Sequence, residues 1–154
     1  MKDITIMIGD VKFNYRAGLI IECGNEILVE VNPDIDFVTI PGGRVKTMET
    51  AKEGLKREIK EELNYTIKDK ECNLRGIIEN FFEYDGNKYH ELYFVYKIKI
   101  DSNHKLYGNE LINNDSDKTY FKWVKKSELN KVNLLPKTLR ALAKTDGFDI
   151  TVSR

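Results

Sequence analysis

The chain has 154 residues, of which 41% are apolar, 32% are charged and 10% are aromatic. This length supports one hydrophobic core of ordinary size and is short for two, and the composition excludes disorder as the dominant state. Lysine and arginine together number 25, as do aspartate and glutamate, so no net charge draws the molecule to nucleic acid or to an anionic membrane. We therefore expect one domain over residues 1–154, with any recognition of phosphate confined to a local site.

The termini and the cysteines carry no sign of export or of cross-linking. No apolar run is long enough for a membrane span, and the first ten residues include Asp3 and Asp10, where a targeting segment would be basic and then apolar. The only cysteines, Cys23 and Cys72, stand outside any disulfide framework or zinc-ligand spacing. We expect a cytoplasmic protein with no membrane partner and two reduced, packed thiols.

The first third of the chain favours β-structure. Two β-prone apolar runs within residues 13–30 flank a Gly-Asn pair at 24–25, a pattern typical of an antiparallel hairpin. After an Asn-Pro-Asp break, residues 37–40 predict a short strand. Pro-Gly-Gly at 41–43 ends that strand, so we expect a special loop there.

Residues 48–63 consist largely of strong helix formers. Apolar residues recur every four positions and form one stripe along this segment: Ala51, Leu55, Ile59 and Leu63. The spacing predicts a helix that packs this stripe on a sheet.

The rest of the chain adds a second hairpin and a second helix. Residues 74–84 and 88–100 are rich in apolar and aromatic β-formers and flank Asp-Gly-Asn at 85–87. Residues 101–118 are polar and predict a surface loop, with a short strand near Leu106. Loops of this length are often functional.

Three shorter features follow this loop. Residues 120–124 predict a strand, and Ser127 can cap a short turn at 128–129. Pro136 fits the first turn of a helix that runs to about Lys144. Together the elements indicate an α+β domain with antiparallel hairpins and two main helices packed on the sheet.

Three carboxylates crowd one edge of the predicted helix. Glu58, Glu61 and Glu62 stand at positions i, i+3 and i+4, which lie beside one another on a helix surface. Like charges at this spacing repel, and a hard divalent cation such as Mg²⁺ or Mn²⁺ would remove the conflict. The competing interpretation is a solvated helix face, because Glu53, Arg57 and Glu61 form ordinary i, i+4 ion pairs.

The Gly-Gly pair favours a metal or phosphate site over a solvated helix face. Gly42 and Gly43 allow the backbone to approach a phosphate or a metal closely, and they lie shortly before a helix N-terminus, which favours anions. The segment that begins at Gly43, GRVKTMETAKEGLKREIKEELNY, resembles the Nudix box, G-x5-E-x7-R-E-U-x-E-E-x-G-U with U an apolar residue. The matching residues are Gly43, Glu49, Arg57, Glu58, Ile59, Glu61 and Glu62.

One position departs from the box. Asn64 stands where the pattern has glycine, and Tyr65 occupies the final apolar place. Asparagine tolerates a left-handed helix terminus better than other residues with a side chain, so we expect the turn to be kept.

The resemblance implies a Nudix-type α/β/α sandwich with a mixed β-sheet. It further implies hydrolysis of a nucleoside diphosphate linked to another moiety, with Mg²⁺ or Mn²⁺ and a water nucleophile. Glu58, Glu61 and Glu62 would be metal ligands, with the Gly43 carbonyl as a further ligand, and one carboxylate would accept the proton of the water.

Supporting roles follow from the same resemblance. Arg57 would orient the glutamates by ion pairing, and Glu49 would fix the preceding loop or bind Arg57. A distal acidic ligand would come from the polar loop, with Glu110, Asp115 and Asp117 as candidates.

Substrate contacts are less well defined by the sequence. Gly42 and Gly43 are expected next to the substrate, and His90 and Glu91 in the second hairpin could face its groove. Four aromatic residues could stack on a base, although strand aromatics more often serve packing: Tyr15, Phe37, Tyr84 and Tyr89.

The leading interpretation is a Nudix pyrophosphohydrolase for a small nucleotide derivative: a nucleoside triphosphate, a nucleotide sugar or a dinucleoside polyphosphate. The alternative is a catalytically silent Nudix-fold sensor or interaction domain, but such a module has no need for carboxylates that repel one another without metal. A nucleic-acid processing enzyme would favour a basic groove, and no extended nucleic-acid surface is evident. A homodimer stays open, as do the physiological substrate and the phosphorus attacked.

Overall fold

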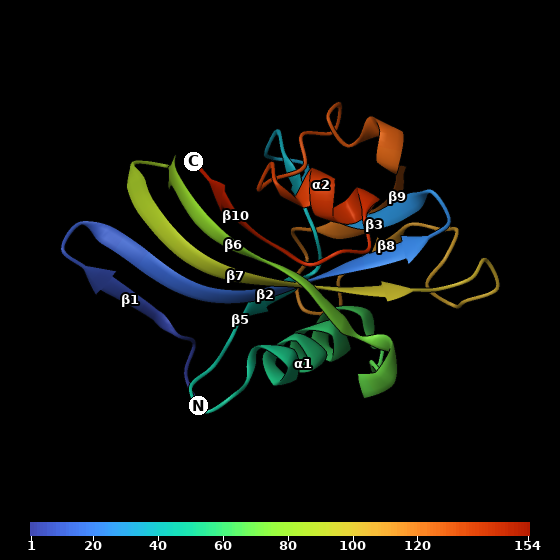
Figure 1. Ribbon diagram of the computed structural model, residues 1–154, viewed down its shortest axis with the longest axis horizontal. Helices are drawn as coiled ribbons and strands as arrows, with labels where there is room; N and C mark the ends of the chain where they lie inside the picture. The colour runs from blue at the N-terminus through green and yellow to red at the C-terminus, as the bar shows by residue number, and fades with distance from the viewer.

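A computed structural model describes residues 1–154 as a ten-stranded mixed sheet with a helix on each face (Figure 1). Helix α1 (Ala51–Leu63) covers one face and α2 (Leu139–Lys144) lies on the other. The strands are β1 (Thr5–Ile8), β2 (Val11–Cys23), β3 (Glu26–Val31), β4 (Val38–Thr39), β5 (Gly42–Arg44), β6 (Asn73–Tyr84), β7 (Asn87–Lys99), β8 (Leu111–Ile112), β9 (Tyr120–Lys125) and β10 (Asp149–Ser153). Two 3-10 turns, η1 (Asp69–Glu71) and η2 (Lys126–Glu128), complete the structure. The predicted α+β sandwich is confirmed.

Strand β2 is the centre of the sheet. Along one edge it pairs in parallel with β7 over residues 11–22, and along the other it pairs successively with β1, β5 and β3. Leu19 and Ile21 belong to the core beneath α1, whereas Ile20 belongs to the core beneath α2. Because both faces are covered, this part of β2 is a continuous apolar run rather than an alternating one.

Helix α1 is built as its stripe predicts. Its four apolar stripe residues are buried in the core on that face of the sheet. The helix begins at Ala51, later than the predicted residue 48, because Thr50 caps it and forms a capping box with Glu53. Met48, at φ 68°, lies outside the helix. Asn64 ends the helix in the left-handed conformation, at φ 52°, as expected from its place in the box.

The two predicted hairpins are present. β2 and β3 pair antiparallel around residues 24–25, and β6 and β7 pair antiparallel around residues 85–86. The short strands at 38–39 and 120–125 also form. The prediction of a loop at Gly42 and Gly43 is wrong, because both residues belong to β5 and pair with β2. Gly42 has φ 146°, and a Cβ there would lie 2.2 Å from the Ala17 carbonyl oxygen.

Three further predictions need correction, and one strand was not predicted. The short strand of the polar loop is β8 at residues 111–112; Leu106 is buried and its carbonyl accepts a hydrogen bond from the Trp123 indole. Ser127 lies inside η2, which has no side-chain cap. Pro136 precedes α2, which begins at Leu139. The segment after α2 forms β10, which pairs in parallel with β6 at the edge of the sheet.

The cysteines and the two helices have simple structural descriptions. Cys23 and Cys72 are both buried and free. Neither α1 nor α2 has the length and apolar character that a bilayer crossing requires.

The left-handed end of α1 gives a stability test. Replacing Asn64 with Ala should lower the free energy of unfolding by about 1 kcal/mol, because a β-carbon without a local polar group disfavours this conformation. Asn64→Gly should stay within about 0.5 kcal/mol of wild type. Urea unfolding measures both, with exposed Asn109→Ala as control. Equal stability of Asn64→Ala and the control would contradict the role of this terminus.

Candidate active site

The Glu58 carboxylate of α1 lies directly over the backbone of β5. A Cβ on Gly43 would lie 2.5 Å from Cδ of Glu58, so glycine leaves room for the carboxylate in this position. On the neighbouring turn, a Cβ on Gly54 would lie 3.0 Å from a carboxylate oxygen of Glu49 and 3.4 Å from the Val45 Cα. The glycines thus accommodate the acidic side chains between α1 and the sheet.

Arg57 connects the acidic residues around the start of α1. Its Nε and Nη2 donate to the two carboxylate oxygens of Glu49, at 2.6 and 3.0 Å. Its Nη1 donates to Glu58 at 2.8 Å and lies 3.5 Å from Glu61. Nη2 also donates to the Arg44 carbonyl of β5 at 3.1 Å. One guanidinium therefore orients three carboxylates and ties α1 to the sheet.

Glu49 also holds the segment before the helix. Its Oε2 accepts a hydrogen bond from the Lys46 backbone N–H at 2.8 Å. The hydrogen bonds from Arg57, opposed by partial burial, lower the pKa of Glu49. Glu49 is therefore a charged link between this segment and Arg57.

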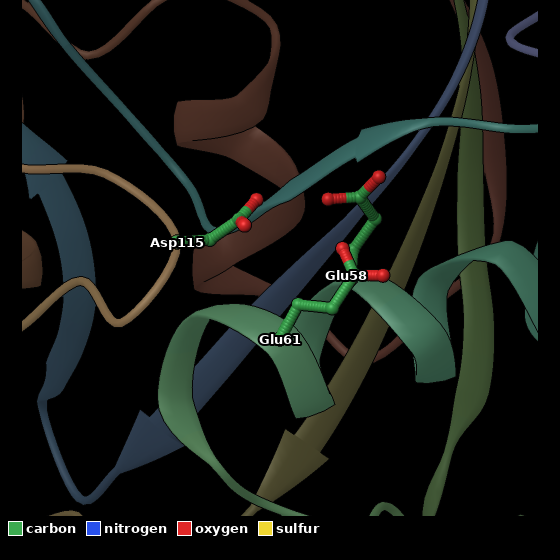
Figure 2. A group of neighbouring side chains, drawn as sticks. All are labelled: Glu58, Glu61 and Asp115. Carbon is green, nitrogen blue, oxygen red and sulfur yellow. The ribbon is translucent and has the colours of Figure 1, made fainter.

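Three carboxylates converge beside β5. Glu58, Glu61 and Asp115 each place an oxygen within 4.8 Å of the others, and Figure 2 shows Asp115 directed toward the two glutamates of α1. Burial raises the pKa of Glu58, and the charges of Glu61 and Asp115 add to this effect against the opposing influence of Arg57. We name these three residues the carboxylate cluster.

Of the three candidate distal residues, Asp115 lies in the carboxylate cluster, on the loop after β8. Asn114 donates its backbone N–H and its side-chain amide to the Glu62 carbonyl, at 2.9 and 3.1 Å. The Asp115 N–H donates to the Asn113 side chain at 2.9 Å. Glu110 and Asp117 are exposed and lie outside the cluster. The asparagines that position this loop were not singled out from the sequence.

Glu62 faces a different partner from its neighbours on α1. It is buried, and its Oε1 accepts a hydrogen bond from the Gly42 N–H at 3.2 Å. Burial, together with the charges of Glu30 and Glu58, raises its pKa to about 9. Glu62 is thus held next to the cluster rather than inside it.

A cavity of about 470 Å³ opens beside Arg44, on the side of the sheet that carries α2. Of the aromatic residues proposed for stacking, Phe37, Tyr84 and Tyr89 line this cavity, whereas Tyr15 packs against Phe94 in the core. Four cationic residues also line it: Arg16, Arg44, Lys137 and Arg154. The cavity combines aromatic surface with positive charge.

Glu91 lies in the cavity wall at the centre of a buried polar row. Its two carboxylate oxygens accept hydrogen bonds from the amides of Asn14 and Asn80, at 2.9 and 3.2 Å. His90 does not line the cavity, because alternate strand residues face opposite ways; its ring contacts Phe13 and Phe81 instead. The structure therefore brings Glu91 to the cavity and leaves His90 away from it.

Several residues of this cavity wall were not singled out from the sequence. Asn14 and Arg16 alternate with aromatic residues on β2, and Asn80 lies among other polar residues of β6. The alternation on β2 was the available signal for a polar face of that strand. Ser153 and Arg154 also line the cavity, and they reach it only because β10 pairs with β6.

Comparison with known families agrees with this geometry. The family model described as NUDIX domain matches residues 16–144, which include α1, β5 and the carboxylate cluster. The chain belongs to the NUDIX family. No curated protein sequence gives a significant match.

Solved structures of NUDIX proteins share the fold. The MutT protein of Bacillus halodurans is 20% identical, with a TM-score of 0.66, and the match covers 91% of this chain and 90% of that one. The MutT NUDIX hydrolase of Burkholderia pseudomallei is 19% identical, with a TM-score of 0.62 and coverage of 87% and 98%. The Ap4A hydrolase of C. elegans is 22% identical, with a TM-score of 0.56 and coverage of 85% and 93%. The family and these neighbours support a Nudix pyrophosphohydrolase.

The donor set of the NUDIX site suits a hard divalent cation. The cluster offers three carboxylate oxygens at short range, and Arg57 pairs with two of the carboxylates, Glu58 and Glu61. Oxygen-only ligands at this density favour Mg²⁺ or Mn²⁺ over softer metals. The residues present therefore fit the divalent metals that Nudix hydrolases generally use.

Glu62 gives a pH-dependent test of the buried acidic group. Because its pKa in the folded protein is about 9, above the ordinary 4.5, metal-free stability should fall as pH rises from 4.5 toward 9. Glu62→Gln removes this titration and should raise stability at pH 7 by up to about 3 kcal/mol, with no gain at pH 4. Thermal melts in EDTA measure the difference, with exposed Glu110→Gln as control. An equal gain at both pH values would contradict the assignment.

Proposed function

We propose that the protein hydrolyses a phosphoanhydride bond in a nucleoside diphosphate linked to another moiety, with Mg²⁺ or Mn²⁺ held by Glu58, Glu61 and Asp115. The observation that carries this proposal is the carboxylate cluster, whose Glu58 lies over Gly43 of β5. The next residue of β5, Arg44, lines the cavity. In this proposal the organic part of the substrate fills the cavity and its phosphates extend past Arg44 to the cluster.

Some residues of the site bind the metal, and others hold those ligands in position. A bound divalent cation would neutralise charge at the pyrophosphate and would lower the pKa of a coordinated water. Arg57 keeps Glu58 and Glu61 oriented, and Glu49 keeps Arg57 in place. Glu62 and the Gly43 carbonyl are further candidate ligands at the border of the cluster.

Hydrolysis then needs a proton acceptor near the attacked phosphorus. The water oxygen forms a bond to phosphorus, the bridging P–O bond breaks, and a carboxylate takes the proton of the water. Glu58 and Glu62 are suitable in position, since both border Gly42 and Gly43.

The cavity lining favours a substrate with an aromatic group and several negative charges. Phe37, Tyr84 and Tyr89 offer stacking surface for a base, and the four cations favour polyphosphate. Nucleoside triphosphates, nucleotide sugars and dinucleoside polyphosphates all meet these requirements. An Ap4A hydrolase among the structural neighbours is a reason to include dinucleoside polyphosphates in any screen.

The decisive experiment is a turnover screen with product identification. The three substrate classes are incubated with Mg²⁺ or Mn²⁺ in ¹⁸O-labelled water, and mass spectrometry locates the label to show which phosphorus was attacked. Metal-dependent hydrolysis of at least one class supports the proposal. Tight binding of a nucleotide with no turnover would instead establish the silent sensor as the function.

Substitutions at two neighbouring aspartates test which residue is the distal metal ligand. Asp115→Asn removes one charge from the carboxylate cluster, so we expect Mn²⁺ affinity to fall about tenfold and turnover to fall at least as much. Asp117→Asn changes the same charge on the same loop outside the cluster and should leave both unchanged. Mn²⁺ titration followed by electron paramagnetic resonance gives the affinities. Equal losses in both variants would reject Asp115 as a ligand.

A further inference from the structure

Arg16 occupies the place where the cavity meets β5. It lies on β2, between Arg44 on β5 and Tyr93 on β7, and all three residues line the cavity. Its guanidinium carbon lies 5.7 Å from the centre of the Tyr93 ring. Arg44 directly follows Gly43, on which the Glu58 carboxylate rests. Arg16 is therefore a cavity cation beside Arg44, and the charge of Glu58 from the carboxylate cluster acts on it.

The guanidinium of Arg16 has no partner of its own. Its Nε is buried and makes no hydrogen bond, and Arg16 takes part in none of the ion pairs of the chain. Burial works against its charge, but the carboxylates of Glu91, Glu30 and Glu58 outweigh that effect and raise its pKa. A cation that stays charged with a buried donor unsatisfied is unusual in a native protein.

The nearby carboxylates are already committed to other groups. Each oxygen of Glu91 accepts an amide hydrogen bond, from Asn14 or from Asn80. Glu30 accepts hydrogen bonds from Asn113 and Thr119, and Glu58 is paired with Arg57. These contacts stabilise the carboxylates in positions where their charge acts on Arg16 without a direct bond. The guanidinium is left available to the cavity.

We propose that Arg16 binds a phosphate oxygen of the substrate from the cavity side of β5, opposite the metal-binding carboxylates. The proposal rests on the function proposed above and names a substrate-binding residue for it. A planar guanidinium presents paired N–H donors that match phosphate oxygens, and a bound phosphate would give its unsatisfied donors an acceptor.

This anchor also orients the rest of the substrate. Tyr93 and Tyr89 stand four residues apart on β7, so the anchor lies about 13 Å from the level of Tyr89 along the strand. At that level the Tyr89 and Phe82 rings stack, with centroids 4.7 Å apart and planes at 5°. With a phosphate on Arg16, the polar row around Glu91 faces the middle of the substrate, and its far end reaches these rings.

The competing role for Arg16 is simple balance of the buried negative charge. A lysine at residue 16 distinguishes the two roles. Lysine keeps the charge but lacks the planar pair of donors, so Arg16→Lys restores a charge balance and does not restore a guanidinium contact with phosphate.

The test measures binding of methylenediphosphonate, a diphosphate that cannot be hydrolysed, by calorimetry in Mg²⁺. We expect Arg16→Gln and Arg16→Lys each to weaken binding at least tenfold and to raise KM for the best substrate more than they lower kcat. Arg75→Gln is the matched control, because Arg75 also has a buried Nε without a partner but lies on β6 outside the cavity. Mn²⁺ affinity without diphosphonate should stay at the wild-type value in all three variants.

Each outcome decides the proposal. Selective loss of diphosphonate binding in both Arg16 variants supports it. Wild-type binding in Arg16→Lys, or equal binding in all variants, overturns it and leaves the hydrolase proposal standing if the wild type turns over substrate. Failure of the wild type to bind diphosphonate also overturns it, and turnover by the same preparation then decides the hydrolase proposal separately. Thermal melts identify a folding defect in Arg16→Gln, in which case Arg16→Lys carries the test.

Discussion

The Glu58 carboxylate lies over the Gly43 backbone, at the place where α1 meets β5. A Cβ at residue 43 would lie 2.5 Å from Cδ of Glu58, so the carboxylate would have to leave this position. The apolar stripe of the same helix holds it down from the other side, through Leu55 and Ile59 in the core. Burial of two such side chains stabilises the fold by roughly 3–6 kcal/mol, enough to hold an acidic helix edge against a strand. The carboxylate cluster depends on this contact between α1 and β5.

The close approach of α1 to β5 brings several carboxylates together, and few cations balance their charge. Arg57 is shared among Glu49, Glu58 and Glu61, so one cation serves three anions. Glu62 has no such partner, and burial raises its pKa to about 9. Without metal, the site therefore reduces its charge by proton uptake as well as by ion pairing. A divalent cation would compete with those protons, which couples metal affinity to pH.

The parts of the structure that were predictable are those set by local sequence. The stripe and the cap signals define α1, and turn residues define both hairpins. β5 was not predictable, because Gly42 and Gly43 favour a loop and become a strand only through pairing with β2. The spacing of the Nudix box found the acidic residues of α1 but could not choose among the loop acids, since Asn114 and its contact with α1 make that choice. The cavity was missed because its lining comes from strands distant in the sequence.

The parallel pairing of β2 with β7 has a consequence for how the molecule assembles. Asn14 and Glu91, which meet across this pair, are 77 positions apart in the chain. Closing so long a loop costs entropy before its contacts form, whereas a helix such as α1 forms from neighbours in about a microsecond. Non-local pairing of this kind slows folding toward the millisecond-to-second range. The helix with Glu58 and Glu61 can thus form early on the folding route, while the cavity wall is completed only when the distant strands have paired.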